Sequence, residues 1–247
     1  MRQKRLGQLD ALLAGGPDRE GGGDGPLVVL NHGFGAPGDD LAMLWRVLDV
    51  PRETRFVFPA APLGLPMMGD ARAWWMIDFE QVQAAMANSL ARDLSSVEPQ
   101  GLLEAREALY SLLDAVEREL RVPPQRTVIG GFSQGAMLAL DAVLRRPRAY
   151  AGLALLSGSL LCRDVWEPLV PRIAGMPVLQ SHGRHDMLLS FQMAKQLSEM
   201  LRAGGVDASF LDFGGGHEIP VSVVERLGAF ITEVLTDKGD DDSEPMM

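Results

Sequence analysis

Two hydrophobic patterns alternate along the chain. Short runs of apolar residues are followed by longer segments in which apolar residues recur every three or four positions. The short runs are continuous rather than alternating, which is typical of strands buried on both faces of a parallel sheet. We expect these strands at residues 27–30, 55–58, 127–130, 153–156, 178–180 and 209–211.

The longer segments predict helices. They cover residues 102–120, 134–145, 191–203 and 220–235, and Pro or Gly residues follow the first three of them. Strands and helices in alternation predict an α/β fold, with a mostly parallel central sheet and helices on both faces. In such a sheet, ligands bind at the carboxyl ends of the strands.

The two ends of the chain differ from the middle. Residues 1–25 finish in a glycine-rich stretch and are expected to form a flexible lead-in. Residues 236–247 are rich in aspartate and predict a disordered acidic tail. A single domain is expected over residues 26–235, because no linker or repeat interrupts them.

The charge balance excludes several classes of protein. The chain of 247 residues carries 23 Lys and Arg against 33 Asp and Glu, a formal net charge of −10. This excess of acid argues against nucleic-acid partners and against a basic membrane anchor. The basic start of the chain is soon interrupted by Gln8 and Asp10, and no apolar run is long enough for stable membrane insertion, so we expect a cytoplasmic protein. One cysteine and four histidines leave little material for a metal site.

A candidate nucleophile lies in the segment Gly131-Phe132-Ser133-Gln134-Gly135, which has the form G-x-S-x-G. It follows a predicted buried strand and precedes a predicted helix. A serine in this context sits on a sharp turn, with small neighbours that let the turn close. Without a base and an acid near the serine, the same segment would be only a glycine-rich turn with a serine cap.

A serine hydroxyl needs a base, and the base needs an acid that orients it. His217 lies between the last predicted strand and the last predicted helix, so it is the expected base. Asp186 follows the strand before that, and Asp212 and Glu218 are its rivals as the acid. Asp186 is favoured because the order Ser133, Asp186, His217 along the chain is that of α/β-hydrolases.

The residues after the first strand of the predicted sheet indicate an oxyanion hole. The turn Asn31-His32-Gly33-Phe34-Gly35 can present a backbone N–H to a tetrahedral intermediate. Together with the N–H of Gln134, which follows the nucleophile, the N–H of Phe34 would complete the hole.

An acyl pocket is harder to place. The candidates are apolar residues of one loop and one residue beyond Asp186: Leu65, Met67, Met68, Trp74, Trp75 and Leu188. Trp and Met suit a groove for a fatty chain, although the same residues could fold back onto the core. The segment 79–101 is long enough to act as a partial lid.

Taken together, these motifs resemble the phospholipase/carboxylesterase family of α/β-hydrolases, which includes acyl-protein thioesterases and small bacterial carboxylesterases. The resemblance covers residues 26–235 and includes His32-Gly33-Phe34-Gly35, Trp74-Trp75, the segment around Ser133, His182-Gly183-Arg184-His185-Asp186 and Gly216-His217. It implies hydrolysis of a small-molecule acyl ester or thioester by a serine triad, without a cofactor or a metal.

Other functions remain open at this point. A lysophospholipase or an acyl-protein thioesterase would share the triad, as would a serine peptidase. A non-catalytic ligand-binding protein could retain the fold alone. The sequence leaves open the acyl chain length, the leaving group, the physiological substrate and the oligomeric state.

Overall fold

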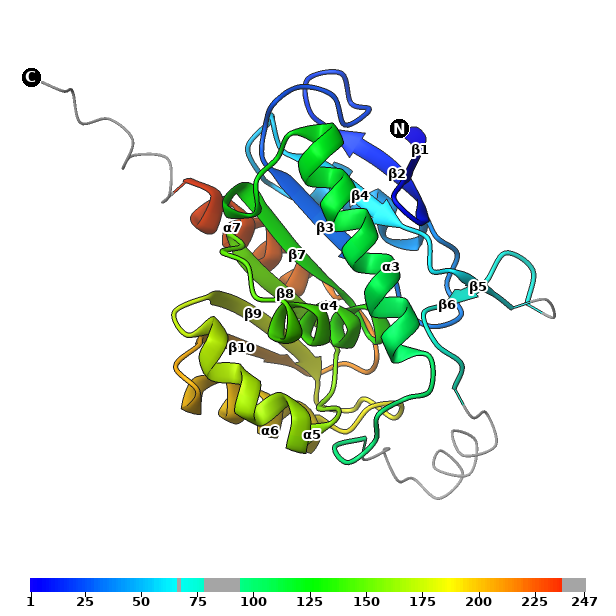
Figure 1. Cartoon of the computed structure of the whole chain (residues 1–247). Coiled ribbons are helices and arrows are strands. Elements are labelled where there is room, and N and C mark those ends of the chain that lie inside the picture. Colours follow the sequence, from blue (N-terminus) through cyan, green and yellow to red (C-terminus); the bar gives the residue numbers. More distant parts are fainter. Residues whose placement is uncertain (66–67, 78–93, 237–247) are drawn as a thin grey trace, which may run out of the picture.

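The computed structural model describes residues 1–65, 68–77 and 94–236 of the chain. Within them, eight strands form one sheet in the order β1-β2-β4-β3-β7-β8-β9-β10 (Figure 1). These strands are β1 (Arg2–Leu6), β2 (Leu9–Gly15), β3 (Leu27–Asn31), β4 (Arg55–Pro59), β7 (Thr127–Phe132), β8 (Gly152–Leu156), β9 (Pro177–Gly183) and β10 (Asp207–Phe213). A small separate hairpin pairs β5 (Leu63–Gly64) with β6 (Arg72–Ala73).

The sheet is mostly parallel, as expected. The strands from β4 to β10 in the sheet order run parallel to one another. The antiparallel pairs of this sheet are β1 with β2 and β2 with β4. All six strands predicted from continuous apolar runs are present, as β3, β4 and β7 to β10. Their residues are buried on both faces in the middle of the sheet, which explains why the runs do not alternate with polar residues.

The expected flexible lead-in is wrong for the first fifteen residues, which form the hairpin β1–β2 at the edge of the sheet. Leu6 and Leu9 face each other across a two-residue turn, in which Gly7 has a φ of 56°. A positive φ suits glycine in a tight hairpin turn. Leu6, Leu9 and Leu13 are buried, so burial of these apolar side chains fixes the hairpin onto the sheet.

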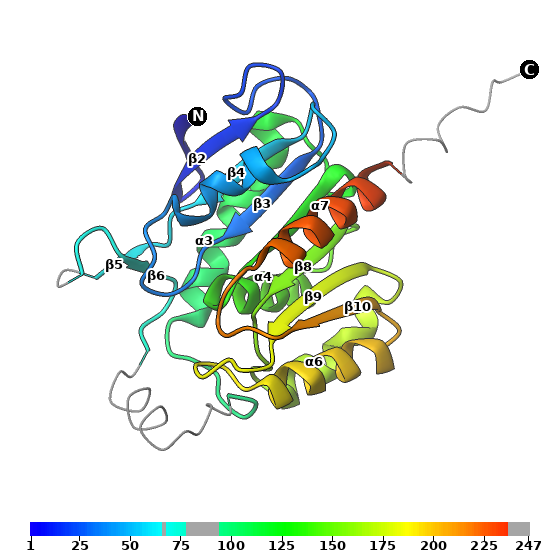
Figure 2. The ribbon, with the colours of Figure 1, turned by 180° about the vertical axis from the view of Figure 1, so that it is seen from behind.

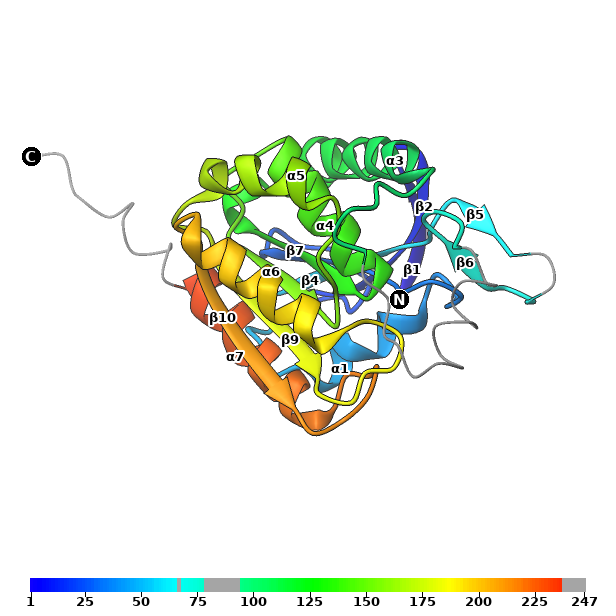
Figure 3. The ribbon, with the colours of Figure 1, turned by 90° about the horizontal axis from the view of Figure 1, so that it is seen from below.

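Helices cover both faces of the sheet. The main helices are α1 (Leu44–Val47), α3 (Leu102–Ala115), α4 (Gln134–Arg145), α5 (Arg163–Trp166), α6 (Phe191–Ala203) and α7 (Val221–Thr236). Short 3-10 or π segments lie at η1 (Asp40–Met43), η2 (Val116–Leu120), η3 (Pro124–Arg126) and η4 (Glu167–Ile173). Seen from behind in Figure 2 and from below in Figure 3, α7 and α1 lie on one face, and α3, α4 and α6 lie on the other.

The alternation of side chains in the strands divides the core into two parts. In β3, Leu27 and Val29 pack with residues of α3 and α4, whereas Val28 and Leu30 pack with α7. A period of two is the geometry of a strand, so a single apolar run supplies both layers. This double burial holds the sheet and the turns at its carboxyl edge in place.

The carboxyl edge collects the residues expected to carry chemistry. Ser133 follows β7, Asp186 follows β9, and His217 lies in the loop between β10 and α7. Thr236 ends α7, and the rest of the predicted acidic tail, residues 237–247, lies outside the described residues. None of the helices described here has the length and apolarity that a membrane crossing requires.

Candidate active site

Ser133 occupies a strained turn between β7 and α4, with φ 54° and ψ −117°. Few residues other than glycine adopt a positive φ, and such conformations persist where the surrounding structure holds them. Here the N–H of Ser133 donates a hydrogen bond of 2.8 Å to the carbonyl of Leu156 on β8. The turn is therefore fastened to the neighbouring strand.

A steric constraint explains why glycines lie on both sides of Ser133. A Cβ atom on Gly131 or on Gly135 would lie well inside contact distance of the carbonyl oxygen of Asn31, at the end of β3. Because both positions back onto the same oxygen, neither tolerates a side chain without moving the strand. The spacing G-x-S-x-G thus reflects the close approach of the elbow to β3.

Asp186 and His217 form a direct pair. Nδ1 of His217 lies 2.6 Å from Oδ2 of Asp186, while Oδ1 of Asp186 accepts the N–H groups of Leu188 (2.8 Å) and Leu189 (2.9 Å). Burial by itself raises the pKa of the Asp186 carboxyl, but its bonds to His217 and to the backbone outweigh burial and leave the pKa below its usual value. The carboxylate therefore stays ionised and faces the imidazole.

A second imidazole also approaches this carboxylate. Nε2 of His182 is 3.3 Å from Oδ2 of Asp186 and 3.1 Å from the carbonyl oxygen of Leu189. Burial lowers the pKa of His182, so the ring is neutral near pH 7. The ring of His182 is thus directed at Asp186 and at the loop that follows Asp186.

The two rivals of Asp186 bind elsewhere. Oδ2 of Asp212 is 2.5 Å from Nε of Arg184. Oε1 of Glu218 accepts the N–H of Gly216 at 3.2 Å, which closes the loop that carries His217. Of these three acidic residues, Asp186 is the one that the structure pairs with His217.

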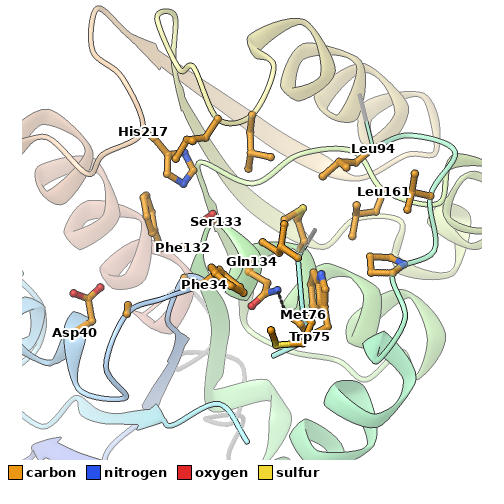
Figure 4. A pocket seen from close by; sticks show the side chains of 18 residues that line it. Phe34, Asp40, Trp75, Met76, Leu94, Phe132, Ser133, Gln134, Leu161 and His217 are labelled. Carbon is orange, nitrogen blue, oxygen red and sulfur yellow. Dashed lines mark hydrogen bonds between the residues drawn. The ribbon is translucent and has the colours of Figure 1, made fainter. Parts of the chain in front are cut away.

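His217 and Ser133 line the same cavity, and Figure 4 shows the imidazole turned toward the serine. The ring of Phe132 supports the imidazole, with 4.8 Å between the ring centroids. Among the described residues, no hydrogen bond joins the Ser133 hydroxyl to His217. Such bonds are often long without substrate and shorten in the complex, so the arrangement is compatible with proton transfer.

The two residues expected to form an oxyanion hole, Phe34 and Gln134, line the cavity together with Ser133. Gln134 is the first residue of α4, so its backbone N–H has no partner within the helix ladder. Its side chain is held on both sides: Oε1 accepts the N–H of Trp74 (2.9 Å), and Nε2 donates to the carbonyl of Trp75 (2.9 Å). These bonds fix the start of α4 against the loop after β6.

The cavity has a volume of about 470 Å³, within the usual range for a small-molecule site. Two expected pocket residues, Trp75 and Leu188, line it. The apolar lining also includes Met76 and Ile77, which follow Trp75, and Leu189, which follows Leu188. Further lining residues come from other segments: Leu94, Val97, Pro99, Met137 and Leu161. In Figure 4, Leu94 and Leu161 lie at the end remote from His217, and Asp40 lies at the opposite end.

Three residues expected in the pocket do not line the cavity that the described residues form, so these three predictions are wrong. Trp74 is buried, and its indole N–H donates to the carbonyl of His32 (2.9 Å), so it supports the site from behind. Leu65 packs in a small cluster with Ala71 and Ala73, and Met68 is exposed. Met67 and residues 79–93 of the expected lid lie outside the described residues.

No group of three or more potential metal ligands (His, Cys, Asp or Glu) occurs within residues 1–65, 68–77 and 94–236. Cys162 is buried, and burial raises its pKa to about 12, so its thiol stays protonated. Its Sγ lies 3.1 Å from the carbonyl oxygen of Val97, beside the apolar end of the cavity. The thiol therefore anchors the segment 94–99, from which Leu94, Val97 and Pro99 reach the cavity.

The sheet order and the strained serine turn after β7 are those of an α/β-hydrolase. The family model described as Phospholipase/Carboxylesterase matches residues 22–235, and the chain belongs to this family. The expected family and fold class are thereby confirmed.

Individual relatives agree with this family. The chain is 27% identical over 234 residues to acyl-protein thioesterase 1 of Neurospora crassa, covering 88% of this chain and 91% of that protein. It is 28% identical over 213 residues to the probable carboxylesterase Os04g0669500 of Oryza sativa subsp. japonica, covering 85% and 77% of the two chains. The crystal structure of esterase PE8 matches with a TM-score of 0.76 and 28% identity, over 92% of this chain and 99% of that one.

Proposed function

We propose that this protein is a serine hydrolase that cleaves carboxylic ester or thioester bonds of small to medium acyl substrates. The observation that carries the proposal is the hydrogen bond of 2.6 Å between Asp186 and His217, beside a strained Ser133 in one apolar cavity. The printed names of the relatives, carboxylesterase, esterase and acyl-protein thioesterase, support the same class of reaction.

In the first half of the reaction, Oγ of Ser133 attacks the carbonyl carbon while Nε2 of His217 takes the hydroxyl proton. The electron pair of the C=O bond moves to oxygen, and the N–H groups of Phe34 and Gln134 stabilise the resulting oxyanion. Asp186 orients the imidazole and stabilises its positive charge. When the tetrahedral intermediate collapses, His217 returns the proton to the leaving alkoxide or thiolate, and an acyl-enzyme remains on Ser133.

In the second half, water replaces the alcohol or thiol. His217 accepts a proton from the water as its oxygen attacks the acyl carbon, and a second oxyanion forms in the same hole. Collapse of this intermediate breaks the bond to Ser133 Oγ, which regains its proton from the imidazole, and the carboxylic acid leaves. Each oxyanion-hole donor is worth about 3–4 kcal/mol in such reactions.

The shape of the cavity supports an apolar acyl group. Leu94 and Leu161 lie at the end of the cavity remote from His217, and Asp40 is the one Asp, Glu, Lys or Arg among the described lining residues. An alkyl chain gains free energy by leaving water for such a surface, at roughly 25 cal/mol per Å². We therefore place the acyl chain toward Leu94 and Leu161, and the leaving group toward His217.

A chain-length series tests this function. p-Nitrophenyl esters from acetate to palmitate and the matching acyl thioesters are compared by kcat/KM, together with labelling by a fluorophosphonate probe. We expect turnover of both classes, an optimum at a short or medium chain, and stoichiometric labelling that Ser133→Ala abolishes. Folded wild-type protein that neither turns over any ester nor reacts with the probe would show a binding protein on this fold.

Two further substrates, a lysolipid and a palmitoylated peptide, separate the related functions. A lysophospholipase would hydrolyse lysolipids faster above their critical micelle concentration, and an acyl-protein thioesterase would prefer a palmitoylated peptide to the free thioester. A cytoplasmic location stays a prediction from the sequence, to be tested by cell fractionation.

A further inference from the structure

His32 lies in the expected oxyanion turn, two residues before Phe34, and is buried, with 1% of its surface exposed. Both of its ring nitrogens have backbone neighbours: Nε2 is 3.0 Å from the N of Ala61, and Nδ1 is 2.7 Å from the carbonyl oxygen of Gly33. Because His32 is not among the described residues that line the cavity, it takes no direct part in the site.

These two neighbours determine the tautomer of His32. The N–H of Ala61 can only donate, so Nε2 must offer its lone pair. The oxygen of Gly33 can only accept, so Nδ1 must carry the proton and donate it. Burial lowers the pKa of His32, which favours the neutral ring that this arrangement requires.

The hydrogen bond to Gly33 sets the direction of the next N–H. The carbonyl of Gly33 and the N–H of Phe34 belong to one planar peptide, and the described residues contain no cis peptide bond. In a trans peptide the C=O and N–H vectors point in opposite directions. Holding the Gly33 oxygen on the imidazole therefore aims the Phe34 N–H away from His32.

The rest of the loop is held by other contacts. Gly35 donates its N–H to the carbonyl of Arg72 (2.9 Å), and Arg72 donates to the carbonyl of Ala36 (3.0 Å). The carbonyl of His32 itself accepts the indole N–H of Trp74. The residues before and after the peptide between Gly33 and Phe34 are thus held by hydrogen bonds. The imidazole of His32 then fixes the orientation of this peptide plane.

We infer that His32 is a positioning residue, whose Nδ1–H holds the Gly33 carbonyl so that the N–H of Phe34 points at the oxyanion. This inference rests on the proposed function, since it concerns the hydrolysis at Ser133. A group that acts only on the oxyanion stabilises the transition state more than the bound ester. Loss of the His32 hydrogen bond therefore lowers kcat and leaves KM nearly unchanged.

Two amide substitutions separate the two nitrogens of the ring. In His32→Asn the amide nitrogen can occupy the place of Nδ1 and donate to Gly33. In His32→Gln the amide reaches the place of Nε2, where it can accept from Ala61 but cannot hold Gly33. We expect His32→Gln to lose about 10²-fold in kcat with KM within about twofold, and His32→Asn to stay within about tenfold of the wild type.

A trifluoromethyl ketone with an acyl-like chain supplies a second measurement. Ser133 Oγ adds to its carbonyl carbon, the hydroxyl proton moves to His217, and the carbonyl electron pair forms an oxyanion in the hole. Affinity for this ketone should fall in parallel with kcat in His32→Gln, while affinity for the corresponding fatty acid changes little. A general loss of structure would instead weaken both ligands and lower the melting temperature.

The wild-type protein provides a measurement that does not depend on the activity of a variant. Because the chain has only four histidines, ¹⁵N-histidine labelling resolves their tautomers by NMR, and His32→Asn assigns one set of signals. The Nδ1–H form at His32 supports the inference. The Nε2–H form, or equal kcat in the wild type and His32→Gln, overturns it while ester hydrolysis by the wild type stands; a wild type without hydrolysis overturns the proposed function itself.

Discussion

The carboxylate of Asp186 contacts the imidazole of His217 through Oδ2 and two backbone N–H groups through Oδ1. Substitution by Asn keeps the size of the side chain but removes the charge and offers an N–H where His217 needs an acceptor. We expect Asp186→Asn to lower kcat by about 10⁴-fold, because the imidazole is then held in the wrong tautomer. Steady-state rates on a p-nitrophenyl ester measure this loss.

Asp212→Asn is the matched control for this prediction. Asp212 is an exposed partner of Arg184 and does not contact His217 in the described part of the chain. We expect its kcat to stay within about threefold of the wild type, since exposed ion pairs contribute little. If Asp212→Asn caused the larger loss, Asp186 would not be the catalytic acid.

Much of this site follows from sequence because its residues lie directly after strands. Ser133, Asp186 and His217 each follow the carboxyl end of a strand that is recognisable as an apolar run. The carboxyl ends of parallel strands lie at one edge of the sheet, so these positions come together. The chain order then distinguishes Asp186 from its rivals. The hydrogen bond of His32 to Gly33, by contrast, depends on Ala61, which comes from a different strand end.

The hairpin β1–β2 and the cavity wall were not predicted, for two different reasons. Gly7 at a two-residue turn between Leu6 and Leu9 was a usable hairpin signal, but the basic start and the later glycines suggested a flexible segment. The wall residues Leu94 and Leu161 lie on irregular segments without a hydrophobic period. Only tertiary contacts, such as that between Cys162 and Val97, bring these segments to the cavity.

Two buried imidazoles, those of His32 and His182, predict that the free energy of unfolding depends on pH in the range where histidine titrates. Burial lowers the pKa of His32 and of His182 below the value of about 6.5 that a histidine has in an unfolded chain. Below that pH the unfolded chain binds protons that the folded chain does not, so the free energy of unfolding falls as pH falls. Each residue contributes a slope of up to about 1.4 kcal/mol per pH unit.

Urea unfolding at pH 7.5, 6.5 and 5.5 measures this slope. Replacement of the buried imidazole in His182→Asn should reduce the slope, by at most one proton. His185→Asn, at an exposed position, is the control for loss of an imidazole. Asp186 adds its own loss of stability only near and below its ordinary pKa of about 4, because its pKa is lowered in the folded state. A wild-type stability that is flat from pH 7.5 to 5.5 would contradict the burial of neutral imidazoles.

Asp141 joins three helices, α3, α4 and α5. Its fully buried carboxylate contacts Arg106 of α3 (2.6 Å), Arg145 of α4 (3.0 Å) and the indole N–H of Trp166 of α5 (2.8 Å). Asp141→Ala leaves the buried guanidinium of Arg106 without this partner, which costs about 3–5 kcal/mol in free energy of unfolding. Asp114→Ala removes a half-exposed partner of Arg146 and Arg148 and should cost less than about 1 kcal/mol. Similar urea midpoints for the two variants would argue against a structural role specific to Asp141.

The apolar end of the cavity predicts a change in chain-length preference. Val97 lines the cavity beside Leu161, yet 42% of its surface is exposed, so a larger side chain fits there without disturbing the core. Val97→Trp should shorten the space for the acyl chain, so kcat/KM falls by about tenfold or more for decanoate esters and stays within about twofold for acetate. Leu103→Trp, at an exposed position outside the described cavity lining, should leave the profile unchanged. An equal loss for acetate and decanoate in Val97→Trp would place the acyl chain elsewhere, since a narrowed acyl pocket discriminates by length.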